Sequence, residues 1–168
     1  MTMFLNARLD EQVKIYVAAA GLALTSTLGD TKYVSMKGYA RCAILISIAD
    51  GTTVTGSTIT LKQATAIAGT SEKALAFTRM LSNVDYVVPT TSVLAETAVT
   101  SNTFTTQTTN SLDSVYVIDV KSEDLDVAGG FDCIRLDGTG HAATAMRGSC
   151  VIYLMYGARN SGLLADVN

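Results

Sequence analysis

The 168-residue sequence has no tryptophan, a single proline and a single histidine. One imidazole cannot supply the pairs of histidines found in most catalytic zinc sites, so a zinc enzyme is not expected. Charged residues make up 16% of the chain, below the average of about 25% for globular proteins, and the net charge is −3. A nucleic-acid-binding protein would show a basic stripe, and none is present. We therefore expect no nucleic-acid partner.

Cysteine is also scarce, with three residues and no Cys-x-x-Cys pair. An odd number without that spacing predicts neither a disulfide framework nor a zinc site. Cys42, Cys133 and Cys150 lie in apolar runs, where a free cysteine usually behaves as a small buried hydrophobe. We therefore predict inert thiols and a protein made in a reducing cytoplasm.

Long hydrophobic runs are missing as well. The longest apolar segment, residues 15–24, is too short for a membrane span, which needs about 20 residues. Asp10 and Glu11 precede it, whereas the segment before a signal-peptide core is basic. The sequence therefore predicts neither a membrane partner nor a signal peptide.

The N-terminal segment allows two interpretations. Apolar residues recur at helical spacing and predict a short helix over residues 6–20, namely Leu9, Val13, Tyr16, Val17 and Ala20. The β-branched residues between positions 13 and 17 equally suit a strand in an extended arm. Residues 1–29 are therefore expected to form an N-terminal helix or arm.

Short strands dominate the rest of the chain. Alternating apolar residues predict strands over residues 41–48, 58–63 and 115–121, and a further run predicts one over 148–158. Gly-, Thr- and Ser-rich turns separate them, which is typical of an all-β sandwich or barrel. We expect a single β-sandwich or jelly-roll-like domain over residues 30–160, followed by a short C-terminal tail over 161–168. Residues 88–112 are expected to form a long Thr-rich loop with an edge strand at 99–106.

The last predicted strand is apolar on both faces, so it is either central or covered by a partner. This doubly apolar strand, the apolar N-terminal segment and the weakly charged surface together favour assembly with other protein subunits. The reason is that exposed apolar patches usually mark interfaces. The alternative is a monomeric sandwich whose N-terminal helix covers one sheet. The predicted capsid or subunit interface consists of Leu9, Val13, Tyr16, Val17, Val151, Tyr153 and Met155.

Three features of the sequence are candidate chemical sites. His141 follows a Gly-Thr-Gly turn and has no sequence neighbour that marks it as catalytic. The acidic stretch 122–126 lacks the ligand order of a calcium-binding EF-hand. Gly129 and Gly130 are not followed by the Lys-Ser/Thr pair of a phosphate-binding loop. The sequence therefore predicts no catalytic residue, no cofactor, no metal site and no enzyme.

Several segments together resemble a known class of protein. They are the strand-and-turn sequences at residues 33–39, 42–48, 58–64, 73–77, 116–120, 123–126, 130–136, 151–153 and 157–159. In this order they resemble small structural proteins of tailed bacteriophages, of a kind often encoded near the capsid gene. The similarity covers most of residues 30–160 and carries no catalytic motif.

The resemblance implies a place in the virion, first of all as a capsid decoration (cement) protein on the outer shell. Such proteins bind the major capsid protein, often as homotrimers, and reinforce contacts between capsid subunits. Residues 1–29 would then be a clamp that reaches a neighbour, or would fold back on their own sandwich. The alternatives are a head-tail connector or tail component and, less favoured, a ligand-binding β-sandwich module without catalysis.

Overall fold

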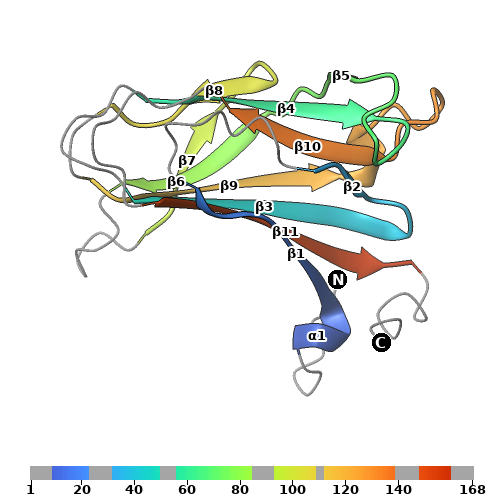
Figure 1. Cartoon of the computed structure of the whole chain (residues 1–168), viewed down its shortest axis with the longest axis horizontal. Helices are drawn as coiled ribbons and strands as arrows, with labels where there is room; N and C mark the ends of the chain where they lie inside the picture. Colours follow the sequence, from blue (N-terminus) through green and yellow to red (C-terminus); the bar gives the residue numbers. More distant parts are fainter. Residues whose placement is uncertain are drawn as a thin grey trace.

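The computed structural model describes residues 9–22, 32–49, 56–84, 93–108, 112–138 and 148–159, which form two antiparallel sheets stacked face to face (Figure 1). The six-stranded sheet contains, from edge to edge, β1 (Val13–Leu22), β11 (Gly148–Ala158), β3 (Tyr39–Ala49), β9 (Ser114–Lys121), β6 (Arg79–Val84) and β7 (Ala95–Ala98).

The five-stranded sheet covers the inner face of the first one. Its strands are β2 (Val34–Ser35), β10 (Cys133–Gly138), β4 (Thr58–Ala64) and β5 (Lys73–Ala74), with β8 (Thr103–Thr105) also paired to β4. Two short helical turns complete the described part, α1 (Leu9–Gln12) and the 3-10 turn η2 (Ser122–Asp124). Among these residues no helix is long and apolar enough to cross a membrane.

Alternation along the strands builds the core between the sheets. Successive side chains of a strand point to opposite faces, so every second residue of β3 and β9 faces inward. The strands predicted at 41–48, 58–63, 115–121 and 148–158 are confirmed, as is the all-β, sandwich-like single domain. The fully buried side chains include Ile44, Ile46, Ile48, Ile59, Leu61, Ile118, Leu136, Tyr153 and Met155.

The helix predicted over residues 6–20 is wrong for the described part beyond Gln12, where the chain forms β1 and pairs with β11. The alternative, a strand, is the observed structure. A helix would leave the backbone of β11 unpaired along this edge, whereas β1 pairs with it from Val13 to Leu22. Tertiary pairing therefore outweighs the helical spacing of the apolar residues.

The segment between β4 and β7 forms the two-residue β5 and then the longer strand β6. Leu75 and Phe77, which follow β5, are both buried in the core. The edge strand predicted at 99–106 is confirmed only in part, as the three-residue β8 paired with β4, and β7 is an additional strand in the other sheet. Residues 88–92 and 109–111 of the predicted loop lie outside the described residues.

Candidate functional site

The outer face of the six-stranded sheet carries a row of apolar side chains. Residues directly opposite each other in paired strands share a face, so the strand register identifies the row. It crosses five strands and consists of Val17, Ile152, Leu45, Val117 and Leu81. Val17 is 61% exposed and the others are half-buried. We call these five residues the apolar row.

A shorter parallel row lies beside it, with Ile15 opposite Leu154 and Leu154 opposite Ala43. It ends at Asp119, which accepts a hydrogen bond of 2.7 Å from the Tyr156 hydroxyl and forms an ion pair with Arg41. The outer face is therefore apolar at its centre and polar at one border. This arrangement is typical of a protein-protein contact surface.

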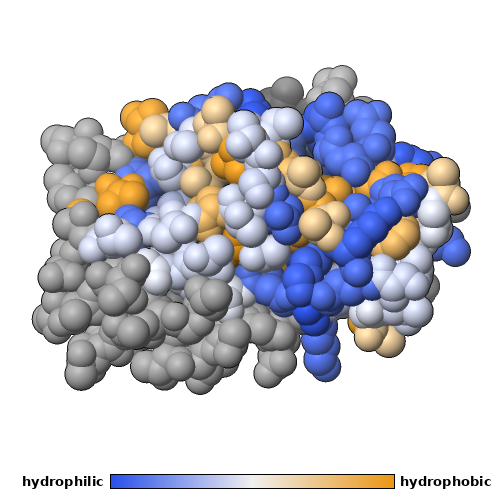
Figure 2. Space-filling model, turned by 90° about the horizontal axis from the view of Figure 1, so that it is seen from above, coloured by the Kyte–Doolittle hydropathy of each residue, from blue (hydrophilic) through white to orange (hydrophobic). Residues whose placement is uncertain are grey.

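The opposite surface of the molecule, over the five-stranded sheet, is mixed, with hydrophilic side chains gathered mainly on the right of the view and apolar ones between them (Figure 2). Lys62 bridges Glu72 and Asp137 at 2.5 and 2.6 Å, and Arg135 contacts the same two carboxylates at 2.9 Å. The Tyr33 hydroxyl donates a 2.6 Å hydrogen bond to Glu72. Two cations thus balance two anions, and the cluster leaves no unbalanced charge for a ligand.

These contacts shift the titration of the cluster. Hydrogen bonds from Lys62 and Tyr33 hold the pKa of Glu72 below its usual value. Burial and the bond to Glu72 raise the pKa of Tyr33 above its usual value. The guanidinium of Arg135 lies over the Tyr33 ring, 4.7 Å from its centroid. The network therefore links β4 and β10 to Tyr33 and Glu72.

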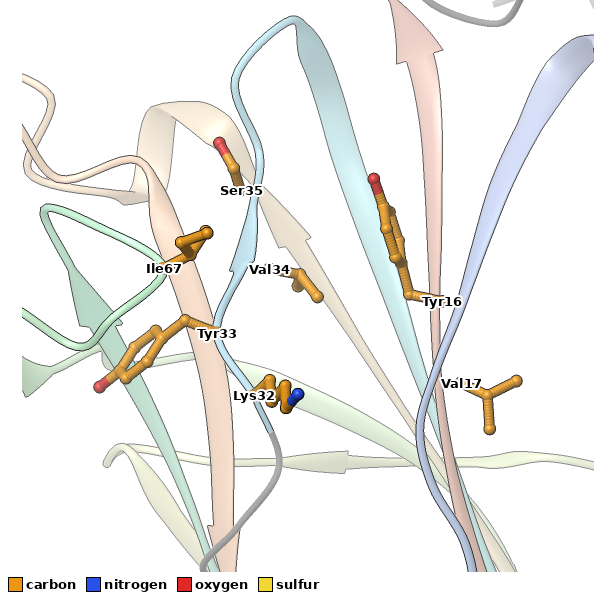
Figure 3. Close-up of a pocket in the computed structure, with 7 residues that line it drawn as sticks. All are labelled: Tyr16, Val17, Lys32, Tyr33, Val34, Ser35 and Ile67. Atoms are coloured by element: carbon orange, nitrogen blue, oxygen red, sulfur yellow. The ribbon is translucent and has the colours of Figure 1, made fainter. Parts of the chain in front are cut away.

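A groove opens where the two sheets end side by side. It has a volume of about 540 Å³ and lies between β1 and β2 (Figure 3). Val34 points toward β1, whereas Tyr33 points away from it. The lining is mostly apolar and consists of Tyr16, Val17, Lys32, Tyr33, Val34, Ser35 and Ile67. We call it the edge groove.

A second cavity of about 540 Å³ is polar, with three cations and two carboxylates among its lining residues. Each cation forms an ion pair within the chain: Arg41 with Asp119, Arg79 with Glu96, and Lys121 with Glu123. This cavity is therefore balanced in charge and does not present an anion site.

The acidic stretch 122–126 forms a structural turn. The Asp126 carboxylate accepts a 2.9 Å hydrogen bond from the Gly129 amide and forms an ion pair with Lys73, and these contacts hold its pKa below the usual value. Within the described ranges, no three or more His, Cys, Asp or Glu side chains are grouped to hold a metal ion. His141 lies outside the described residues.

The cysteines differ in burial. Cys42 and Cys133 are buried, as predicted. Burial raises the pKa of both thiols, that of Cys133 to about 12. Cys150 is only half-buried, because it lies opposite Ser47 on the outer face rather than in the core. The prediction of burial is therefore wrong for Cys150.

The predicted interface residues separate into two groups. Leu9 is 60% exposed, Val17 is exposed beside the edge groove, and Val13 and Tyr16 are half-buried on β1. Val151, Tyr153 and Met155 are fully buried between the sheets and cannot contact a partner. They lie opposite inward-facing residues of β3, and the Leu136 amide donates a 2.8 Å hydrogen bond to the Tyr153 hydroxyl.

The other face of β11 is the available one, and it carries Ile152 and Leu154. Because both faces of this strand are apolar, alternation alone could not distinguish the inner face from the outer face. The sequence analysis also did not identify Leu45, Val117 and Leu81 as surface residues of interest. They could have been found because each is an apolar residue on the side of its strand, β3, β9 or β6, that faces away from the core.

No family of proteins, no curated protein and no solved structure matches this chain. Apolar side chains gather at the outer face and at the edge groove, and Val93 and Leu94 are further exposed apolar residues in the described part of the chain.

Proposed function

We propose that this protein is a non-enzymatic virion structural protein of a tailed bacteriophage, made in the host cytoplasm and bound to the outer capsid surface as a decoration (cement) protein. Its partner in this role is the major capsid protein, which it stabilises. The resemblance of residues 30–160 to small phage structural proteins supports a place in the virion. The apolar row supports docking onto another protein.

The apolar row is the observation that carries the proposal. Apolar side chains exposed on a sheet face gain free energy when a partner removes them from water, at about 25 cal/mol per Å². A row across five strands offers a broad, nearly continuous contact, which suits attachment to a shell surface better than enclosure of a small molecule. Many copies on one shell would add their separate contacts to its stability.

The test is attachment of purified protein to shells that lack it, measured by co-sedimentation. Leu81→Lys and Val117→Lys place a charge in the apolar row, and we expect each to weaken attachment by roughly 10- to 100-fold, the equivalent of one buried apolar side chain. Thr103→Lys is the matched control, because Thr103 lies on β8 in the opposite sheet. Equal attachment of all three variants would contradict docking through the row.

The number of copies per particle separates the virion alternatives. Quantitative mass spectrometry of purified virions measures this protein against the major capsid protein. A number comparable with the capsid protein supports decoration. A number in the low tens or fewer supports a head-tail connector or tail component. Absence from particles would contradict the virion role and favour a ligand-binding module.

A further inference from the structure

The β1 strand forms one edge of the six-stranded sheet and offers a surface beyond the proposed function. It pairs with β11 on one side, and within the described residues no strand pairs with its other side. Ile15 and Val17 on this strand are 49% and 61% exposed. A strand edge that no described strand pairs with, and that carries exposed apolar side chains, can serve as a template for pairing with another strand.

The regular part of this edge is short. The register with β11 is continuous from Val13 to Val17, and irregularities follow between Val17 and Ala19 and between Ala20 and Leu22. Bulges of this kind twist an edge and end its pairing. Five residues, Val13–Val17, are therefore available as a regular strand.

These five residues are complementary to themselves. In an antiparallel pair with Ile15 opposite Ile15 of the partner subunit, Val13 lies opposite the partner's Val17 and both share the outer face. On the inner face, Lys14 lies opposite the partner's Tyr16. The Lys14 ammonium already lies 5.5 Å from the centroid of the Tyr16 ring in its own chain, and a second ring adds a cation–π contact.

We propose that β1 of one copy pairs antiparallel with β1 of a second copy, around a two-fold axis at Ile15. The short rows Ala43–Leu154–Ile15 of the two copies then meet and form one apolar row across the joined sheets.

The lysine restricts the register of this pairing. A charged residue on the inner face of an edge strand discourages pairing with arbitrary strands. A two-fold axis at Lys14 would place two ammonium groups opposite each other, which is unfavourable. The axis at Ile15 places each Lys14 opposite an aromatic ring instead, so this register is selected over its neighbour.

The contact is smaller than a standard interface, which buries about 800 Å² on each partner. We therefore expect a dimer that dissociates on dilution, and a high local concentration of copies on a shell would favour it. The resemblance to phage proteins implies a homotrimer, whereas this pairing produces a dimer. The two are distinguished by a measured mass.

Engineered disulfides test the register directly, in a Cys150→Ser background that removes the half-buried native thiol. Opposite residues of an antiparallel pair have Cα atoms about 4.5–5.5 Å apart, within the range of a disulfide. Ile15→Cys should therefore form a covalent dimer under mild oxidation. Val17→Cys alone should cross-link at least tenfold more slowly, because four residues of offset separate the two thiols by about 13 Å.

A mixture of Val13→Cys and Val17→Cys should form the mixed dimer faster than either protein forms its own. Sedimentation of the unmodified chain should show a monomer-dimer equilibrium, which Ile15→Lys shifts to monomer. Val127→Lys is the control, since Val127 is an exposed apolar residue in the turn between η2 and β10. Monomer at every concentration, a trimer, or equal cross-linking of all three cysteine variants would overturn the proposal. Because no shells are present, its failure is separate from failure of the capsid role.

Discussion

At the residue scale, the buried hydroxyl of Tyr153 shows how the sandwich places a polar group inside its core. The side chain is fully buried, and its oxygen accepts the 2.8 Å hydrogen bond from the Leu136 amide on the facing sheet. One side chain thus joins β11 to β10 across the core. An aromatic residue at this position therefore contributes both apolar burial and a defined contact between the layers.

Replacing Tyr153 by phenylalanine removes this contact and keeps the ring. We expect the free energy of unfolding to fall by about 1–2 kcal/mol, since a buried amide loses its partner hydroxyl. Thermal denaturation measures the change. Tyr156→Phe is the control, because the Tyr156 hydroxyl contacts Asp119 at the half-exposed border of the outer face, so its loss should cost less. Equal losses in the two variants would contradict this role of Tyr153.

The three thiols provide a second residue-scale prediction. In the native protein Cys150 should react first with a thiol reagent, because it is half-buried on the outer face, while Cys42 and Cys133 are buried. With a pKa of about 12, Cys133 has almost no thiolate at pH 8. Mass spectrometry should find one modified cysteine in native protein and three after denaturation. Early labelling of Cys42 or Cys133 would contradict the described burial.

At the element scale, the pairing of β1 decides which variants can test whether the N-terminal segment binds a partner. Its described residues pair with β11 of the same chain, and Tyr16 packs against the core. This agrees with the alternative in which the segment folds back on its own sandwich. Deleting residues 1–29 would remove a strand of the sheet along with any clamp. Point substitutions at exposed positions of β1 therefore separate docking from folding.

The β4–β10 pair carries the charged cluster, and Glu72 makes the stability of this layer depend on pH. Because the pKa of Glu72 is lower in the folded than in the unfolded chain, its charge stabilises the fold above the unfolded value of about 4.3. That contribution is lost as the pH falls through the lower folded value. We expect Glu72→Gln to reduce the loss of stability between about pH 5 and pH 3.

Urea unfolding at a series of pH values measures this difference. Glu96→Gln is the matched control, because it removes an exposed ion pair with Arg79, and exposed pairs contribute little. If Glu72→Gln and the native chain lose stability in parallel as the pH falls, Glu72 does not have the stabilising role assigned to it.

At the scale of the whole molecule, strand pairing is non-local. The first strand pairs with the last, and β3 lies between β11 and β9. The long stretches of chain between paired strands must close before the strands make contact, and the entropy lost in closing them slows folding. We therefore expect refolding on the millisecond-to-second timescale. Stopped-flow fluorescence of the seven tyrosines would measure it. Refolding within microseconds would be inconsistent with this topology.

The outer surfaces of the two sheets differ in chemical character. One is charged, balanced and held by ion pairs, whereas the other is apolar at its centre. A molecule of this kind can attach through one surface and present the other to water. This difference between the surfaces supports the docking role proposed above.

The alternation of side chains by itself determined the all-β class and the strands β3, β4 and β9, and a continuous apolar run indicated β11. The buried residues Ile44, Ile59 and Ile118 lie on the apolar face of these alternating strands. A period of two fixes which residues share a face, and this information is local. The sequence therefore also identified β11 as apolar on both sides. The sequence alone does not show which side of that strand faces the second sheet.

Only the tertiary structure decided that point, together with the fate of the N-terminal segment. Val151, Tyr153 and Met155 are buried because β3 beside them turns its own core residues the same way. Residues 13–22 form a strand because β11 offers an edge to pair with. The apolar row exists because the register brings together residues from five strands that are far apart in the sequence. Each of these depends on contacts between distant segments, which no local pattern encodes.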